Sequence, residues 1–166
     1  MNYYTYLIMR NLQRGILIDT EPLLLFFVGA CDKNRIKTSK CTRKFTVDDY
    51  DLLIQFTSKF RKIVTTPNIL TEASNLLSHE PDKIKRDFYT LFSSYVRGFE
   101  ERFTPSKKIV IHKNFSKFGL TDLAILDNAK GRYLVLTVDL PLFGYLQNMG
   151  VDVINFNHLR TMNLLA

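Results

Sequence analysis

The stretch FGLTDLAILDNAKGRYLVLTVD, residues 118–139, begins with the pattern of an amphipathic helix. Thr121 and Asp122 stand where a polar helix cap is expected, and the apolar residues that follow recur at helical spacing as far as Ala129. A lysine and a glycine at 130–131 then supply the cation and the permissive backbone that are typical of a helix C-terminus. This part of the stretch therefore predicts a helix that begins at Thr121 or Asp122.

The rest of the stretch predicts a buried strand. Residues 133–138 form a continuous apolar and β-branched run, typical of a strand in a parallel sheet, and the run ends on Asp139. In an open parallel sheet, the carboxyl ends of strands and the starts of nearby helices line one crevice, where ligands bind. Asp122 also lies on the apolar stripe of its helix, where a carboxylate is costly unless it is paired or bound to a cation. These two acids are a first indication of a metal site.

The arrangement of strand, acid and helix occurs a second time near the start of the chain. Residues 15–18 are a short apolar run that ends at Asp19, and Glu21 and Pro22 then open a predicted helix. Because the carboxyl ends of parallel strands share one edge of a sheet, we expect Asp19 to lie at the same edge as Asp139.

A fourth acid occurs on another predicted helix. Residues 62–65 are a brief apolar strand, and Thr66 and Pro67 open the helix that follows it. The inward stripe of this helix consists of Ile69, Ala73, Leu76 and Leu77. Glu72 falls on the same face, where a core-facing glutamate requires a cation.

The alternation of helices with short apolar strands predicts parallel crossovers. The expected fold class is α/β, a three-layer α/β/α sandwich with a central parallel sheet. We expect one domain across 1–166, with 1–13 as a short N-terminal arm and 157–166 as a tail. The pattern is least clear in 78–113, where only one amphipathic helix, within 82–100, is predicted.

Charge and composition indicate which binding partners and which cellular compartment to expect. The net charge of +7 favours a polyanionic partner such as nucleic acid or an acidic protein. Cys31 and Cys41 have no cluster of His or Cys around them, which argues against a zinc site, and we interpret them as free thiols or as a loop disulfide. The longest apolar run, 23–30, is far shorter than the roughly 20 residues that cross a bilayer. The N-terminus lacks the layout of a secretory signal, so a cytoplasmic protein with no membrane partner is expected.

Cations cluster between residues 31 and 44, where Asp32 is the only acid. The cluster consists of Lys33, Arg35, Lys37, Lys40, Arg43 and Lys44. Such a segment is either a solvated loop or a flap that contacts the phosphates of RNA, because clustered cations release counterions when they neutralise a nucleic-acid backbone. On the second interpretation, Lys37, Lys40 and Arg43 are RNA-binding residues.

Asp19, Glu72, Asp122 and Asp139 together are the candidate metal ligands. Brought to one place, their carboxylates would supply the hard oxygen donors that suit Mg²⁺ or Mn²⁺. Each acid alone also has a structural explanation, as a helix cap, as a turn at a strand end or as the partner of a buried cation. No glycine-rich phosphate loop, Cys/His ligand set or nucleophile elbow competes with the four acids.

Four segments of the chain resemble motifs of the PIN-domain ribonucleases, which include the toxins of bacterial VapBC modules. They are GILIDT (15–20), TTPNILTEASNLL (65–77), GLTDLAIL (119–126) and YLVLTVD (133–139). Their order and spacing agree with the family from about Arg14 to Leu159, most weakly in 78–113. The resemblance implies a central parallel sheet with a metal-dependent nuclease site at its carboxyl edge.

The resemblance also implies a role for each acid. Asp19, Asp122 and Asp139 would be direct or water-mediated ligands of Mg²⁺ or Mn²⁺. Glu72 would be a ligand or the group that orients the attacking water. The small polar residues that support these acids are Thr20 and Thr137. In this chemistry a bound Mg²⁺ lowers the pKa of a water, orients it for in-line attack on an RNA phosphodiester and neutralises charge in the transition state.

Two functions follow as alternatives. The first is an active endoribonuclease, which the resemblance extends to a toxin held by an antitoxin protein and to pairing as a homodimer. The second is a catalytically inactive PIN-like module that binds RNA or serves as a scaffold. Many family members carry another acid two residues beyond the T-x-D aspartate, where this chain has Pro141, so the site would hold fewer metals or bind one more weakly. The complete set of four acids favours the first function, and Pro141 leaves room for the second.

Overall fold

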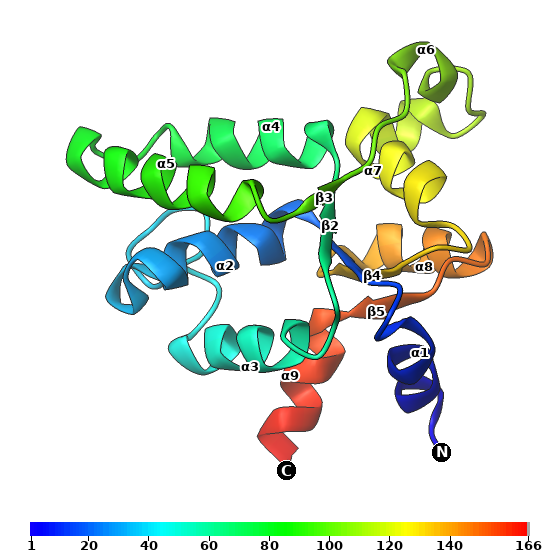
Figure 1. Cartoon of the computed structure of the whole chain (residues 1–166), viewed down its shortest axis with the longest axis horizontal. Coiled ribbons are helices and arrows are strands. Elements are labelled where there is room, and N and C mark those ends of the chain that lie inside the picture. The colour runs from blue at the N-terminus through cyan, green and yellow to red at the C-terminus, as the bar shows by residue number, and fades with distance from the viewer. Residues whose placement is uncertain (166) are drawn as a thin grey trace.

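Five parallel strands form one sheet in the computed structural model, which describes residues 1–165, with side chains as far as 162 (Figure 1). The strands are β1 (Ile16–Ile18), β2 (Ile63–Thr65), β3 (Glu100–Glu101), β4 (Leu134–Thr137) and β5 (Val153–Asn155), in the order β3-β2-β1-β4-β5. The helices are α1 (Tyr3–Asn11), α2 (Thr20–Cys31), α3 (Val47–Thr57), α4 (Pro67–Leu77), α5 (Asp82–Val96), α6 (Ser106–Ile109), α7 (Phe115–Ala129), α8 (Leu140–Asn148) and α9 (Phe156–Leu165), with a 3₁₀ turn, η1 (Lys33–Arg35).

Helices cover both faces of this sheet. In Figure 1, α2, α3, α4 and α5 lie to the left of the strands, and α1, α7 and α8 lie to the right. The chain passes from β1 through β2 to β3 by way of the first group, and it then returns across the sheet through α7 to β4 and through α8 to β5. Because parallel crossovers are almost always right-handed, the reversal of direction moves the helices to the other face. The predicted α/β/α sandwich with a central parallel sheet is confirmed.

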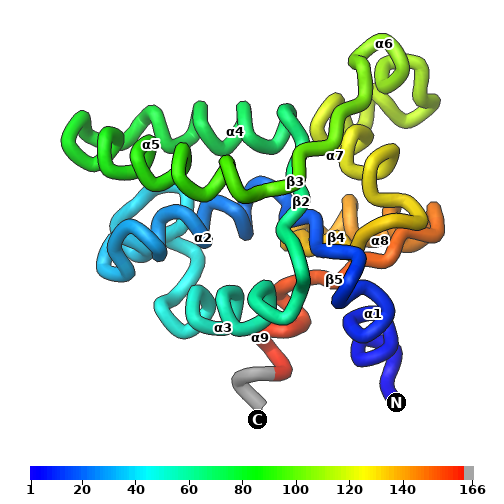
Figure 2. Tube along the Cα trace, viewed as in Figure 1, coloured from blue at the N-terminus to red at the C-terminus, as the bar shows by residue number. Residues whose placement is uncertain are grey.

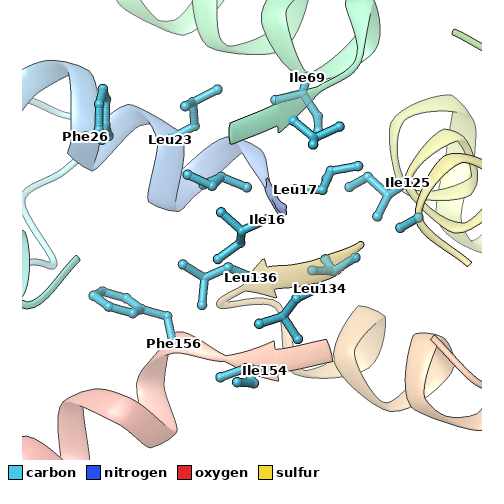
Figure 3. Packing of buried hydrophobic residues seen from close by; sticks show 14 of the residues in the cluster. Ile16, Leu17, Leu23, Phe26, Ile69, Ile125, Leu134, Leu136, Ile154 and Phe156 are labelled. Atoms are coloured by element: carbon cyan, nitrogen blue, oxygen red, sulfur yellow. The ribbon is translucent and has the colours of Figure 1, made fainter. Parts of the chain in front are cut away.

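The core forms where apolar strands are covered on both faces by helices. Ile16, Leu17 and Ile18 of β1 are completely buried, as expected for the central strand of a parallel sheet. Figure 3 shows side chains from the strands meeting those of the helices on either side, with Leu134, Leu136 and Ile154 from the sheet and Leu23, Ile69 and Ile125 from α2, α4 and α7. Each fully buried aliphatic side chain contributes about 1.5–3 kcal/mol.

The register of the sheet fixes the edge at which the strands end. Ile18 at the end of β1 pairs with Leu136 in β4, and the Asp19 N–H donates to the Leu136 carbonyl at 2.9 Å. Asp19 is the N-cap of α2 and Asp139 is the N-cap of α8. Both carboxylates therefore follow neighbouring strands at one edge of the sheet, because a capping residue stands at the transition from strand to helix.

A kink in α7 sets the position of Asp122. Gly119 has φ 77° and ψ −172°, a conformation that interrupts the helix and that favours glycine. The second part of α7 begins after this glycine, so Thr121 and Asp122 lie in its first turn. The predicted helix start is therefore correct for this part, and α7 also has a preceding part that begins at Phe115.

Both ends of the chain contain helices where an arm and a tail were expected. Residues 3–11 form α1, which buries Leu7 against the core. Residues 157–165 belong to α9, which Arg160 fixes to Asp49 of α3 with an ion pair at 2.8 Å, and residue 166 lies outside the described residues. None of the helices in the described part of the chain combines the length and the apolar character that a bilayer-spanning segment needs.

Candidate functional site

The four predicted acids lie close enough to influence one another electrostatically. Asp19 follows β1, Asp139 follows β4, Asp122 lies in the first turn after the kink of α7, and Glu72 lies on α4. Asp19, Asp139 and Glu72 all raise the pKa of Asp122. The acids thus come from four elements that are far apart in the sequence, and together we call them the acid cluster.

Asp19 is the most deeply buried member of the acid cluster, with 8% of its surface exposed. One carboxylate oxygen accepts the Thr20 N–H at 2.7 Å, and the other accepts the Thr137 hydroxyl at 2.7 Å. Burial raises the pKa of Asp19 to about 6 against the effect of these two hydrogen bonds, and the charges of Asp139 and Glu72 raise it further. Ionisation of Asp19 in the folded protein is therefore electrostatically unfavourable.

Ionisation of Asp122 is more unfavourable than that of Asp19. Burial raises the pKa of its carboxyl to about 7, and the charges of Asp19, Asp139 and Glu72 act in the same direction. In the described residues no hydrogen-bond donor compensates this carboxylate, in contrast to Asp19. A cation bound beside Asp122 would offset both causes of the raised pKa.

Glu72 and Asp139 lie at the exposed rim of the acid cluster. The prediction that Glu72 faces the core is wrong, because its side chain is exposed, and Leu76 on the same helix is also 44% exposed. The inward face of α4 is therefore narrower than the sequence pattern suggested. Asp139 is exposed as well, and one of its oxygens accepts the Leu142 N–H at 2.8 Å.

Three threonine hydroxyls orient the acids. Thr20 donates to one oxygen of Glu72 at 3.0 Å, and Thr121 donates to the other. Thr137 donates to Asp19 and accepts the Asp139 N–H at 3.0 Å, so a single hydroxyl connects two acids. Thr20 and Thr137 were predicted to support the site. Thr121 was considered only as a helix cap, and its contact with Glu72 depends on the packing of α4 against α7.

The donor chemistry of the acid cluster fits a partly hydrated Mg²⁺ or Mn²⁺. In the part of the chain that the structure describes, no three acidic, His or Cys side chains lie close enough to bind one ion together. Direct ligation by all four acids is therefore not supported by their positions. Mg²⁺ usually keeps several waters and binds proteins through one or two carboxylates, which is compatible with this spacing. A cation would lower the raised pKa of Asp19 and of Asp122, so these are the two acids whose ionisation it would favour most.

The acid cluster opens into a groove between α4 and α7. Glu72 and Asp122 line this groove, which has a volume of about 500 Å³, together with Phe103, Phe118 and Leu120. Its size lies within the usual range for ligand-binding sites. The groove leaves Glu72 and Asp122 accessible from solvent on the side where α4 faces the kink of α7.

The basic segment 31–44 is anchored close to the same edge. Lys44 forms an ion pair with Glu21 in the first turn of α2, two residues after Asp19. Lys40 and Arg43 line a hollow of about 260 Å³ beside Glu21. These cations therefore lie beside the N-terminus of α2, where Asp19 is the N-cap.

Replacing Thr137 with Val keeps the shape of the side chain but removes the hydroxyl that donates to Asp19. We expect the free energy of unfolding to fall by about 1–3 kcal/mol at pH 8, because a buried carboxylate oxygen loses its donor. The loss should be smaller at pH 5, where Asp19, with a pKa of about 6, is mostly protonated.

Urea denaturation at the two pH values measures this difference. Thr90→Val, at an exposed hydroxyl on α5, is the matched control and should change stability little at either pH. An equal loss for Thr137→Val at both pH values would contradict the role of the hydroxyl in holding an ionised Asp19.

Comparisons with family models, with curated proteins and with solved structures gave no match for this chain.

Proposed function

We propose that the protein is a Mg²⁺- or Mn²⁺-dependent endoribonuclease that hydrolyses phosphodiester bonds at the acid cluster. The observation that carries the proposal is the placement of Asp19, Glu72, Asp122 and Asp139, which come from four separate elements. Burial and the three other acids together raise the pKa of Asp122 to about 7. Carboxylates crowded in this way at the carboxyl edge of a parallel sheet are costly to keep ionised unless a cation binds them. The PIN-domain resemblance of the same residues gives the reaction class.

The residues of the site have distinct roles in this proposal. Asp19 and Asp122 would hold the ion, and Asp139 would contribute to its binding from the exposed rim. Glu72, held by two threonine hydroxyls, orients the attacking water. Bound Mg²⁺ supplies charge neutralisation and a lowered pKa for that water. Thr137 keeps the Asp19 carboxylate in place.

Cleavage of single-stranded RNA with and without EDTA tests the proposal. We expect wild-type protein to cleave in Mg²⁺ or Mn²⁺, to stop in EDTA and to recover when excess cation is added back. Cleavage at an unchanged rate in EDTA would contradict the proposal.

A second function remains compatible with the same site. A PIN-like module that binds RNA or acts as a scaffold without cleaving it is favoured by two observations: Pro141 stands where many family members have another acid, and no three ligating side chains in the described residues lie together. Binding of RNA without cleavage in any divalent cation would select this alternative.

The basic segment 31–44 is the proposed path of the RNA backbone toward the acid cluster. Replacing Lys37, Lys40 and Arg43 with Ala should weaken RNA binding and reduce the dependence of log affinity on log salt, by about 0.7 for each lost phosphate contact. A salt titration of binding to single-stranded RNA measures this slope. The control Lys59→Ala/Lys83→Ala removes exposed cations from other elements, and an unchanged slope for the triple variant would make the segment an ordinary solvated loop.

A cytoplasmic location and a toxin–antitoxin setting are part of the same proposal. Cys31 and Cys41 are free thiols, which is usual in a reducing compartment. An antitoxin protein would have to cover the groove or the acid cluster to block RNA, and a homodimer is proposed from the family resemblance alone.

A further inference from the structure

The segment 102–118, which we call the basic arm, is a second concentration of positive charge beside the groove. It contains one arginine and four lysines, and no acid occurs between Glu101 and Asp122. The lysines are Lys107, Lys108, Lys113 and Lys117, all of them exposed. Arg102 pairs with Glu100, but none of the four lysines forms an ion pair within the described residues. Their charge is therefore available to an external anion.

The basic arm projects from the sheet but is firmly attached to it. Figure 2 shows α6 and the turn after it standing beyond α7, at the top of the view. Ile109 of α6 is completely buried, and His112 contacts Asp127 of α7 at 3.0 Å. At the base of the arm, Asn128 donates to the Thr104 hydroxyl at 2.9 Å. The arm thus presents its exposed side chains on a fixed support.

Phe103 is the exposed aromatic side chain of this arm. It is 69% exposed, although burial of a phenylalanine is worth about 1.5–3 kcal/mol. It lines the same groove as Glu72 and Asp122. Phe118 lines the groove as well, but its ring is already stacked on Tyr145 with centroids 4.4 Å apart. Among the described residues, no aromatic ring is stacked on Phe103.

We propose that the basic arm is a nucleic-acid contact surface that stacks an unpaired base on Phe103 while Lys107 and Lys108 contact the adjacent phosphates. Cations that follow the backbone, combined with an aromatic platform for the bases, form the usual binding surface for single strands. The interior of a duplex offers no base face to Phe103, because each base there is stacked between its neighbours. The proposal rests on the proposed function, since the groove leads the stacked nucleotide to the acid cluster.

The positive charge of the basic arm indicates which kind of partner binds it. The groove between α4 and α7 is lined by the exposed Phe103 and Leu120, and a protein could also cover such apolar surface. The uncompensated lysines beside it, however, favour a polyanion. A protein partner is therefore an outcome of the test rather than part of the proposal.

Fluorescence anisotropy in EDTA separates binding from cleavage. The probes are fluorescein-labelled 12-nucleotide oligoadenylate, its deoxy counterpart and a 12-base-pair G·C-rich RNA duplex. We expect Phe103→Leu to bind the single-stranded RNA about 10-fold more weakly than wild type, and Phe103→Trp to bind it about as well, because only the ring is needed for stacking. Neither change should alter binding of the duplex. Tyr3→Ala, which removes an exposed aromatic ring on α1, is the matched control and should bind like wild type.

A salt titration tests the lysines in the same assay. Lys107→Ala/Lys108→Ala should lower the salt slope for the single strand by about 1.4, while the control Lys59→Ala/Lys83→Ala leaves it unchanged. If Phe103→Trp loses as much affinity as Phe103→Leu, or if the duplex loses as much as the single strand, stacking on Phe103 is overturned. If the variants lose equal affinity for the RNA and the DNA single strand, the surface binds both. If they lose affinity for one strand alone, the surface is specific for that strand.

Two further outcomes separate this inference from the proposed function. If the Phe103 and lysine effects are found but no RNA is cleaved in Mg²⁺, the binding surface stands and the nuclease proposal fails. If none of the three probes binds wild-type protein, the basic arm is not a nucleic-acid surface, and the apolar rim of the groove is left to a protein partner.

Discussion

Asp122→Asn should lower the rate of RNA cleavage by about a thousandfold or more while leaving the fold intact. An amide is a poor ligand for Mg²⁺ and cannot balance its charge, and a catalytic metal contributes several kcal/mol to transition-state stabilisation, of which about 4 kcal/mol corresponds to a thousandfold. The Asp122 side chain makes no hydrogen bond that holds the described fold together, so its loss should affect chemistry rather than structure.

Single-turnover cleavage of a labelled single-stranded RNA in Mg²⁺ measures this effect. Asp87→Asn, at an exposed position on α5 that is not part of the acid cluster, is the matched control and should cleave like wild type. A variant Asp122→Asn that keeps more than about a tenth of the wild-type rate would remove Asp122 from the proposed ion site.

The stability of the metal-free protein should show the cost of the same charge. The pKa of Asp19 is raised from 3.8 to about 6 and that of Asp122 from 3.8 to about 7. A carboxyl whose pKa is higher in the folded state binds its proton more tightly when folded, so its contribution to stability falls as the pH rises from about 4 to about 7. The ionised acid cluster should therefore destabilise the metal-free protein at pH 8.

The difference between Asp122→Asn and wild type isolates the Asp122 contribution from other titrating groups. In EDTA at pH 8 the variant should melt about 3–6 °C above wild type, which corresponds to roughly 1–2 kcal/mol after allowance for solvent screening of a partly exposed group. At pH 4 the two melting temperatures should nearly coincide, because Asp122 is protonated and uncharged. Scanning calorimetry from pH 4 to pH 8 measures both values.

Added Mg²⁺ should make wild type more stable than Asp122→Asn. At a Mg²⁺ concentration of 100 times its Kd, wild type should gain about 2.7 kcal/mol at pH 8, and the variant should gain much less. A melting difference that does not change with pH, or an equal gain from Mg²⁺ in both proteins, would contradict the proposed electrostatics of the acid cluster.

The sequence predicted those parts of the fold that depend on local pattern. Asp19 and Asp139 could be placed at one edge because each follows an apolar run and precedes a helix, and parallel strands end together. The exposure of Glu72 could not be predicted. The sequence pattern places Glu72 on the apolar face of α4, but it does not show how much of that face α7 covers. Thr121 became part of the site only through its contact with Glu72, which joins residues 49 positions apart.

Elements that owe their existence to tertiary contacts were missed. The strand β3 consists of Glu100 and Glu101, which carry no apolar pattern. Lys62 and Tyr133 bind the Glu100 side chain, and β2 pairs with this strand along its backbone. The part of the basic arm that falls within 78–113 was not distinguished, since an exposed Phe103 and a short α6 lack the periodicity from which helices and strands are predicted.

Titration with Mn²⁺ followed by electron paramagnetic resonance tests the central claim most directly, because the signal of the free ion falls when it binds. The acid cluster predicts that wild-type protein at pH 8 binds Mn²⁺, that Mg²⁺ competes for the same site and that Asp122→Asn loses the binding while Asp87→Asn keeps it. Absence of Mn²⁺ binding by wild type, or equal binding by wild type and Asp122→Asn, would show that these acids do not form a metal site.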